Sequence, residues 1–176
     1  MNNYYKQIKE LLTNNEITKQ IKNYSINKSD LITYYNIGKI LNEAGNKYGE
    51  KIIETYSYKL INEVNKKYNK STLFKMKKFY LIFSNKKVAP LVPQLSWSHC
   101  LLLIPMKNID KINYYINQTA QRNLSKRNLQ KIIKSNEYER LPLEVKLKLV
   151  ILITILIYYY LILNTLQIKE FYLENI

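Results

Sequence analysis

The chain has 176 residues, a hydrophobic content of 47% and a formal net charge of +15. This hydrophobic content excludes a wholly disordered chain and is enough for one domain with a core. The single cysteine, Cys100, excludes an internal disulfide, and with one histidine there is no Cys and His cluster for zinc, so we expect neither a metal nor another cofactor.

Apolar residues recur at helical spacing almost throughout, and no period-two alternation lasts long enough to predict a sheet. The first predicted helix covers residues 4–24. Residues 27–30 have the composition of a helix start, and the helix that follows is expected to break near Asn46, between Gly45 and Gly49. A third helix is predicted over residues 52–64. The expected fold class is therefore all-α, a helical bundle.

A tight turn and a basic helix come next. Asn69 is a good capping residue in front of a helix whose apolar positions include Leu73 and Tyr80. The cations of this helix fall largely on its other side, and they are Lys70, Lys75, Lys77 and Lys78. This arrangement of helix, turn and basic helix resembles a helix-turn-helix unit.

Two lysines and two prolines predict a loop over residues 85–93. A short helix capped by Ser96 then ends near Pro105. Trp97 and His99 are expected to have a core or interface role, with the His99 ring bonded to a backbone carbonyl or a Ser side chain. A nucleophile and base pair of Cys100 and His99 is disfavoured, because neighbouring helix residues point about 100° apart.

A further helix is expected to begin at Asp110 as its cap, and after it the turn pattern repeats. Ser125 corresponds to the earlier Asn69, and Leu129 to Leu73. The cations available outside this second basic helix are Lys126, Arg127, Lys131 and Lys134. The match predicts two helix-turn-helix-like units, although it is also consistent with a solvated basic face on an ordinary bundle.

The positive charge is concentrated between residues 64 and 136, where fifteen Lys and Arg face a single acid, Asp110. Such a field repels itself in the folded chain unless a polyanion neutralises it, and phosphate backbones are the commonest such partner. We therefore predict that the chain binds DNA and that the cations of both basic helices converge on one surface.

The three arginines are Arg122, Arg127 and Arg140. A planar guanidinium suits phosphate or base-edge contacts better than an ammonium does. For Arg140 an ion pair with Glu137 is an equally good expectation.

Six sequence blocks, in order, resemble the YhcG N-terminal domain family. They are Tyr34-Tyr35-Asn36-Ile37-Gly38-Lys39, Tyr48-Gly49, Met76-Lys77-Lys78-Phe79-Tyr80, Gln94-Leu95-Ser96-Trp97-Ser98-His99, Leu124-Ser125-Lys126-Arg127 and Tyr138-Glu139-Arg140-Leu141. The resemblance implies a bacterial helical domain with helix-turn-helix character, usually placed ahead of a PD-(D/E)XK nuclease domain. Two positions depart from the family pattern, Lys77 in place of Arg and Leu124 in place of an aromatic. The expected organisation is an N-terminal helix over 1–26, the family domain over 27–141 and a tail over 142–176.

A nuclease of that kind needs an Asp and a (Asp/Glu)-x-Lys triplet on adjoining strands to hold Mg²⁺ and orient water. The triplet occurs once, at Glu144-Val145-Lys146, and the aspartates are Asp30 and Asp110. None has a strand-like setting, so we expect a truncated form without catalysis of its own. Besides DNA, the partners that this leaves open are a second copy of the chain and a separate nuclease subunit.

The tail has a different composition, because residues 149–168 contain no charged side chain. The segment is long enough to span a bilayer, but it also fits a packed helix or a frame-shifted remnant. The polar N-terminus predicts no signal peptide and a cytoplasmic protein, with the inner membrane as the alternative. The rival function is a protein-interaction or dimerisation module that uses Trp97 and the seventeen Tyr.

Overall fold

The computed structural model describes residues 2–21, 26–84 and 95–152, together with 154, 155, 158 and 162. All regular structure in this described part is helical, as the hydrophobic spacing predicts. The described residues form two compact units, one made of 2–84 with 95–105 and the other of the residues from 106 onward. The loop predicted over 85–93 lies outside the described residues.

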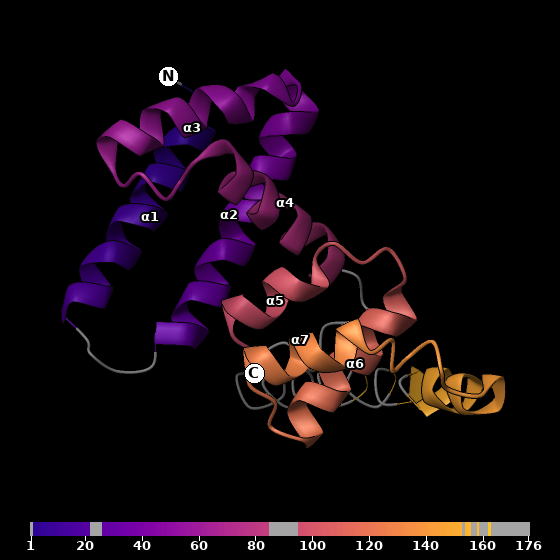
Figure 1. Cartoon of the computed structure of the whole chain (residues 1–176). Helices are drawn as coiled ribbons and strands as arrows, with labels where there is room; N and C mark the ends of the chain where they lie inside the picture. Colours follow the sequence, from indigo (N-terminus) through magenta and orange to yellow (C-terminus); the bar gives the residue numbers. More distant parts are fainter. Residues whose placement is uncertain are drawn as a thin grey trace, which may run out of the picture. The chain divides into compact units, whose positions relative to one another are not determined.

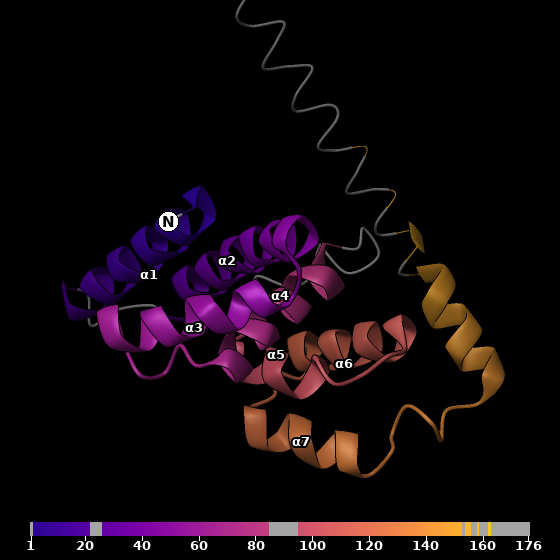
Figure 2. The same ribbon diagram turned by 90° about the horizontal axis from the view of Figure 1, so that it is seen from above.

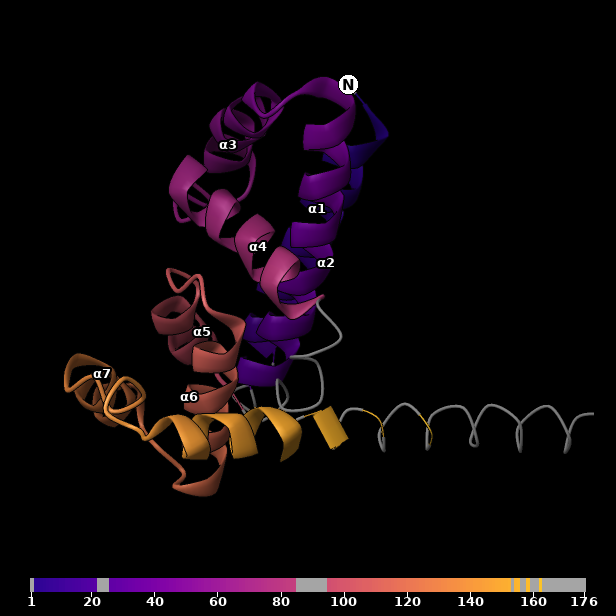
Figure 3. The same cartoon turned by 90° about the vertical axis from the view of Figure 1, so that its right-hand side faces the viewer.

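The first unit is built around α2 (Ile26–Tyr48), which contacts the four other helices of the unit. These are α1 (Asn3–Ile21), α3 (Lys51–Glu63), α4 (Lys70–Phe83) and α5 (Trp97–Leu103). Figure 1 and Figure 2 both show α1 lying beside α2, and Figure 3 shows α4 lying against α2. The central position of α2 explains why its apolar residues Ile37 and Leu41 are fully buried.

The contact between α2 and α4 is unusually close at Gly38. A Cβ placed there would lie 2.8 Å from the Cβ of Tyr80 and closer still to the carbonyl of Met76, so any larger residue would push α4 away. The inner face of α4 supplies Leu73 and Phe79, both fully buried. Burial of each such side chain stabilises the fold by about 1.5–3 kcal/mol. α4 is therefore fixed in the core of the first unit.

The glycines have roles that differ from the predicted break near Asn46. α2 runs through Gly45 and ends at Tyr48, where Gly49 takes a φ of +81° that favours glycine. A Cβ at Gly45 would lie 3.2 Å from the amine of Lys77. Gly45 therefore makes room for a side chain of α4 and does not end the helix. At its other end α2 begins at Ile26, before the predicted start.

The predicted caps are confirmed with one correction. The side chain of Asn69 accepts a hydrogen bond from the backbone N–H of Thr72 at 3.0 Å, and that of Ser125 accepts from Asn128 at 3.3 Å. In the helix between them, the cap is Asn108, which accepts from the N–H of Lys111 at 3.0 Å. Asp110 lies in the first turn, where a carboxylate also favours the helix start.

The second unit contains α6 (Ile109–Gln121), α7 (Lys126–Lys134) and a further helix over residues 143–152. Within the described residues, no helix combines the length and the apolar composition needed to cross a bilayer. Most of the uncharged segment 149–168 lies outside the described residues. The alternatives for that segment therefore stay predictions.

Candidate nucleic-acid interface

Helices α6 and α7 are joined by a turn of four residues, 122–125 (Figure 2). Asn123 takes a positive φ of 45° in this turn, a conformation that Asn tolerates better than most residues. The N–H of Leu124 bonds back to the carbonyl of Thr119 at 3.0 Å, and Leu129 is fully buried. The turn and this one apolar anchor fix the position of α7 on its unit.

The cations of α7 lie on one side of the helix. At about 100° per residue, the order around the helix is Lys126, Gln130, Lys134, Arg127 and Lys131, within an arc of about 140°. All five residues are exposed, whereas the apolar Leu129 and Ile132 lie on the opposite side, buried and half-buried. None of the four cationic side chains forms an ion pair or hydrogen bond with another described residue. We call Lys126, Arg127, Gln130, Lys131 and Lys134 the α7 face.

Residues 135–141 follow α7 and contact α6 and the turn after it. The carboxylate of Glu137 accepts a hydrogen bond from the Tyr114 hydroxyl at 2.6 Å and pairs with Arg122 at 3.1 Å. Burial and the adjacent Glu137 raise the pKa of Tyr114, so its hydroxyl stays a donor at neutral pH. Because the Glu137 carboxylate is held by Arg122, the expected pair between Glu137 and Arg140 is not formed.

A second ion pair ties the same segment to α6. Lys111 donates to the carboxylate of Glu139, and this hydrogen bond holds the pKa of Glu139 below its ordinary value. The backbone N–H of Tyr138 also donates to the hydroxyl of Tyr115 at 3.4 Å. The acids of segment 135–141 therefore bond to α6 and leave the α7 face uncompensated.

The predicted α4 cations divide into two pairs. Lys77 is buried, with 10% of its side chain exposed, and it donates to the carboxylate of Glu50. Lys70 is paired with Glu54 of α3. Lys75 and Lys78 are exposed and have no ion pair within the described chain. Lys77 therefore does not lie on the exposed side of α4, where the sequence pattern had put it.

The exposed side of α4 also carries apolar residues, unlike the α7 face. Leu81 is 51% exposed, and Phe74 and Ile82 are half-buried on the same side as Lys75 and Lys78. α4 belongs to the first unit and α7 to the second. The convergence of both sets of cations on one surface stays a prediction.

The aromatic residues singled out in the sequence lie in the packing of the first unit. The ring of Trp97 meets Tyr34 at 4.8 Å and Phe79 at 5.4 Å, both edge-on, and Tyr80 meets Tyr35 at 5.2 Å. These contacts support the core role expected for Trp97.

His99 caps the start of α5. Its Nδ1 accepts from the backbone N–H of Ser96 at 3.1 Å and lies 2.9 Å from the Ser96 hydroxyl. The expected bond to a Ser side chain is thus confirmed. Burial raises the pKa of the adjacent Cys100 to about 12, so this residue is a thiol at neutral pH.

The Glu144-Val145-Lys146 triplet lies on the helix over residues 143–152. Lys146 donates to the backbone carbonyl of Glu139 at 2.9 Å, and Glu144 pairs with Lys148 at 2.6 Å. Among the described residues there is no group of His, Cys, Asp and Glu side chains that could hold a metal ion.

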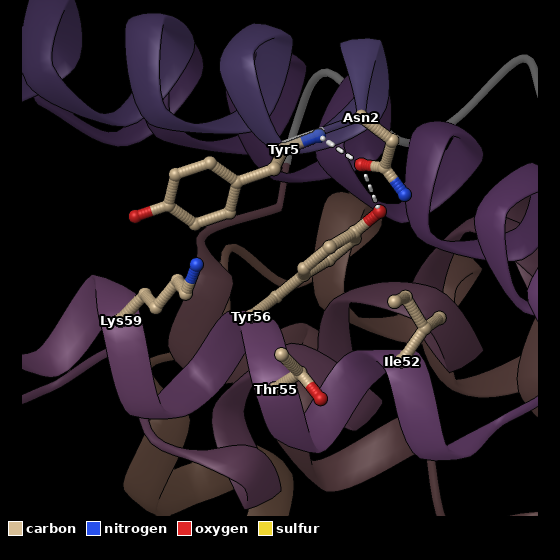
Figure 4. A pocket seen from close by; sticks show the side chains of 6 residues that line it. All are labelled: Asn2, Tyr5, Ile52, Thr55, Tyr56 and Lys59. Atoms are coloured by element: carbon tan, nitrogen blue, oxygen red, sulfur yellow. Dashed lines mark hydrogen bonds between the residues drawn. The ribbon is translucent and has the colours of Figure 1, made fainter.

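A small pocket of about 190 Å³ lies between α1 and α3 (Figure 4). Asn2 joins the two helices there, because its side-chain oxygen accepts from the Tyr5 N–H at 3.2 Å and from the Tyr56 hydroxyl at 2.6 Å. The amine of Lys59 lies 5.8 Å from the centre of the Tyr5 ring. The sequence gives no signal for this pocket, since Asn2 stands outside every apolar pattern.

Comparison with family models matches the DUF1016 N-terminal domain over residues 7–140. Comparisons with curated proteins and with solved structures gave no match. The matched range begins within α1, covers α2 to α7 and makes up most of the chain, and it contains all of the six sequence blocks except Leu141. The chain therefore belongs to the DUF1016 N-terminal domain family, which is the YhcG N-terminal family.

Proposed function

We propose that this chain is the DNA-binding helical module of a YhcG-type nuclease system. In this proposal α6 and α7 form a helix-turn-helix unit, α7 contacts duplex DNA, and catalysis belongs to a nuclease domain or a separate nuclease chain. Such a role places the protein in the cytoplasm, where the chromosome of a bacterium lies.

The observation that carries the proposal is the α7 face. Its four cations are exposed and unpaired within the described chain, although seven other Lys and Arg side chains of the described chain form ion pairs. An unneutralised cationic arc on one helix fits the phosphates of a nucleic acid. Lys75 and Lys78 of α4 are the further cations available for contact.

The salt dependence of binding tests the proposal. Each phosphate that is neutralised contributes about −0.9 to the slope of log affinity against log salt. In non-specific binding, where all four cations of the α7 face can contact phosphates, that face alone predicts a slope of about −3.6, and adding Lys75 and Lys78 predicts about −5. Fluorescence anisotropy of a labelled duplex, measured over a range of salt concentrations, gives the slope. A slope near zero, or no binding at low salt, would contradict the proposal.

Charge reversal locates the contact. Lys126→Glu with Arg127→Glu should make the salt slope about 2 units shallower, because two phosphate contacts are lost. The matched control is Lys6→Glu with Lys39→Glu, which makes the same change of net charge at exposed positions of α1 and α2. If both double variants weaken binding equally, the net charge and not the α7 face attracts DNA.

A second candidate function, protein interaction, is supported by the apolar residues on the exposed side of α4. Phe74, Leu81 and Ile82 offer a patch that a second copy or a partner chain would cover. Size-exclusion chromatography with light scattering measures the mass with and without duplex DNA. A dimer that Leu81→Ser dissociates, without loss of DNA binding, would establish this function beside the first.

A further inference from the structure

The residue types on the α7 face differ between the middle of the arc and its edges. In the first two turns of α7, the order around the helix is Lys126, Gln130, Arg127 and Lys131, at about 0°, 40°, 100° and 140°. In these two turns Gln130 and Arg127 therefore occupy the middle of the arc, and a lysine stands on each edge. Lys134, at about 80°, continues the middle of the arc in the following turn. All four side chains are exposed, and none has a hydrogen-bond partner among the described residues.

The residue types in the middle and at the edges differ in what they recognise. A Gln amide can bond the N6 and N7 groups of adenine, and an Arg guanidinium can bond the O6 and N7 groups of guanine, both in the major groove. Lysine is a compact point charge that suits a phosphate. A helix inserted in the major groove turns its middle toward the base edges and its two flanks toward the phosphates of the two strands.

From this order we propose that α7 reads base edges in the major groove of duplex DNA through Arg127 and Gln130. Lys126 and Lys131 hold the flanking phosphates. The inference rests on the proposed function and adds sequence preference to it. The expected ligand is duplex DNA, because the B-form major groove is about 12 Å wide and admits a helix. The major groove of duplex RNA is too deep and narrow for side chains to read.

Selection from a duplex library with a randomised centre tests the inference. The full chain should enrich a short motif that contains a guanine and an adenine. Arg127→Lys, which keeps the charge, should lower the preference for the selected duplex over a scrambled one by roughly 5- to 150-fold, and Gln130→Ala should relax another position by a similar factor. The matched controls are Arg140→Lys and Gln121→Ala, which alter exposed residues outside α7 and should leave the motif unchanged.

Base analogues then test the groove itself. Replacing the selected guanine by 7-deazaguanine removes the N7 acceptor in the major groove and leaves the phosphates intact. The wild type should lose affinity, and an Arg127→Ala variant should lose little more on the same replacement, because its bond to N7 has already gone. If the losses of binding free energy from the Arg127 substitution and from 7-deazaguanine add up, the assignment of Arg127 to this base is overturned.

The outcomes separate the inference from the proposed function. If salt-dependent binding persists but no motif is enriched, or the motif survives both α7 substitutions, base reading is wrong and phosphate binding by α7 stands. Equal affinity for duplex RNA of the selected sequence would also overturn the major-groove assignment. If no duplex binds at any salt concentration, both proposals fail together.

Discussion

The helices α4 and α7 begin in the same way, but their cations have different surroundings. Each has a polar cap that bonds the N–H three residues later, and each buries a Leu four residues after the cap. On α4, two of the four lysines are paired with Glu50 and Glu54, whereas the α7 cations have no such partner within the described chain. A shared local pattern therefore does not decide which cations are available, because their partners come from elsewhere in the fold.

The largest effect should come from reversing the buried lysine of α4. Lys77→Glu places an unpaired carboxylate at a buried position beside the Glu50 carboxylate, whose own side chain is more than half exposed, so the free energy of unfolding should fall by about 3–5 kcal/mol. Lys75→Glu makes the same change at an exposed position of the same helix and should alter it by less than about 0.5 kcal/mol. Urea unfolding of both variants provides the measurement. Equal losses of unfolding free energy in the two variants would mean that Lys77 and Lys75 have the same surroundings.

The next largest effect should come from removing the buried side chain that packs α7 on its unit. α7 has one fully buried side chain, Leu129, whereas α4 buries five residues. Leu129→Ala should destabilise the packing of α7 by about 2–5 kcal/mol, and Leu129→Met by less than about 1.5 kcal/mol. Amide hydrogen exchange should show faster exchange in α7 and unchanged protection in α2 and α4. Uniform loss of protection over both units would contradict this separation.

Removing the cap side chains of α4 and α7 should destabilise the two helices by smaller and similar amounts. Asn69→Ala and Ser125→Ala each remove one side-chain bond to a backbone N–H, at a cost of about 1 kcal/mol. Exchanging the cap types, as Asn69→Ser and Ser125→Asn, should be close to neutral. Amide exchange at Thr72 and Asn128 measures the two bonds directly. If the Ala substitution destabilises only one of the two helices, the N-terminal caps of α4 and α7 are not equivalent.

The smallest effect should appear on acidification. The hydrogen bond from Lys111 lowers the pKa of Glu139 in the folded state, so this pair stabilises the fold above the unfolded-state pKa of about 4.3 and stops doing so as the pH falls through the folded-state value. For this half-exposed pair the contribution should be about 0.2–1 kcal/mol. Glu139→Gln should remove that part of the acid sensitivity, and Glu43→Gln on α2 should not. Unfolding curves at neutral and acidic pH measure the difference.

Local chemistry made much of the fold predictable. Apolar spacing indicates the helices because each helix buries one side, and the caps Asn69, Ser96 and Ser125 act within three or four residues of their own position. The break predicted near Asn46 comes two residues later, after Tyr48, because Gly49 ends the helix and Gly45 inside it makes room for the Lys77 side chain. The cap of α6 was misplaced by two residues because Asn108 and Asp110 are both favourable near a helix start.

The candidate site was predictable in part. The sequence places cations and Leu129 at helical spacing, so an exposed basic side of α7 follows from the pattern alone. It does not show that Glu137 and Glu139 turn toward α6, or that Glu50 reaches Lys77, because these contacts join residues that are 15 to 28 positions apart. Gly38 was noted as part of a family block, but its close contact with Met76 needs the packed helices to be seen.

The most direct measurement of the central claim is contact between α7 and DNA. A photocrosslinking amino acid in place of Gln130 should form a covalent adduct with a labelled duplex on irradiation, and salt should abolish the adduct along with binding. The same amino acid in place of Tyr58, which is 74% exposed on α3, should form none. Crosslinking from position 58 and not from position 130, with binding intact, would contradict the account.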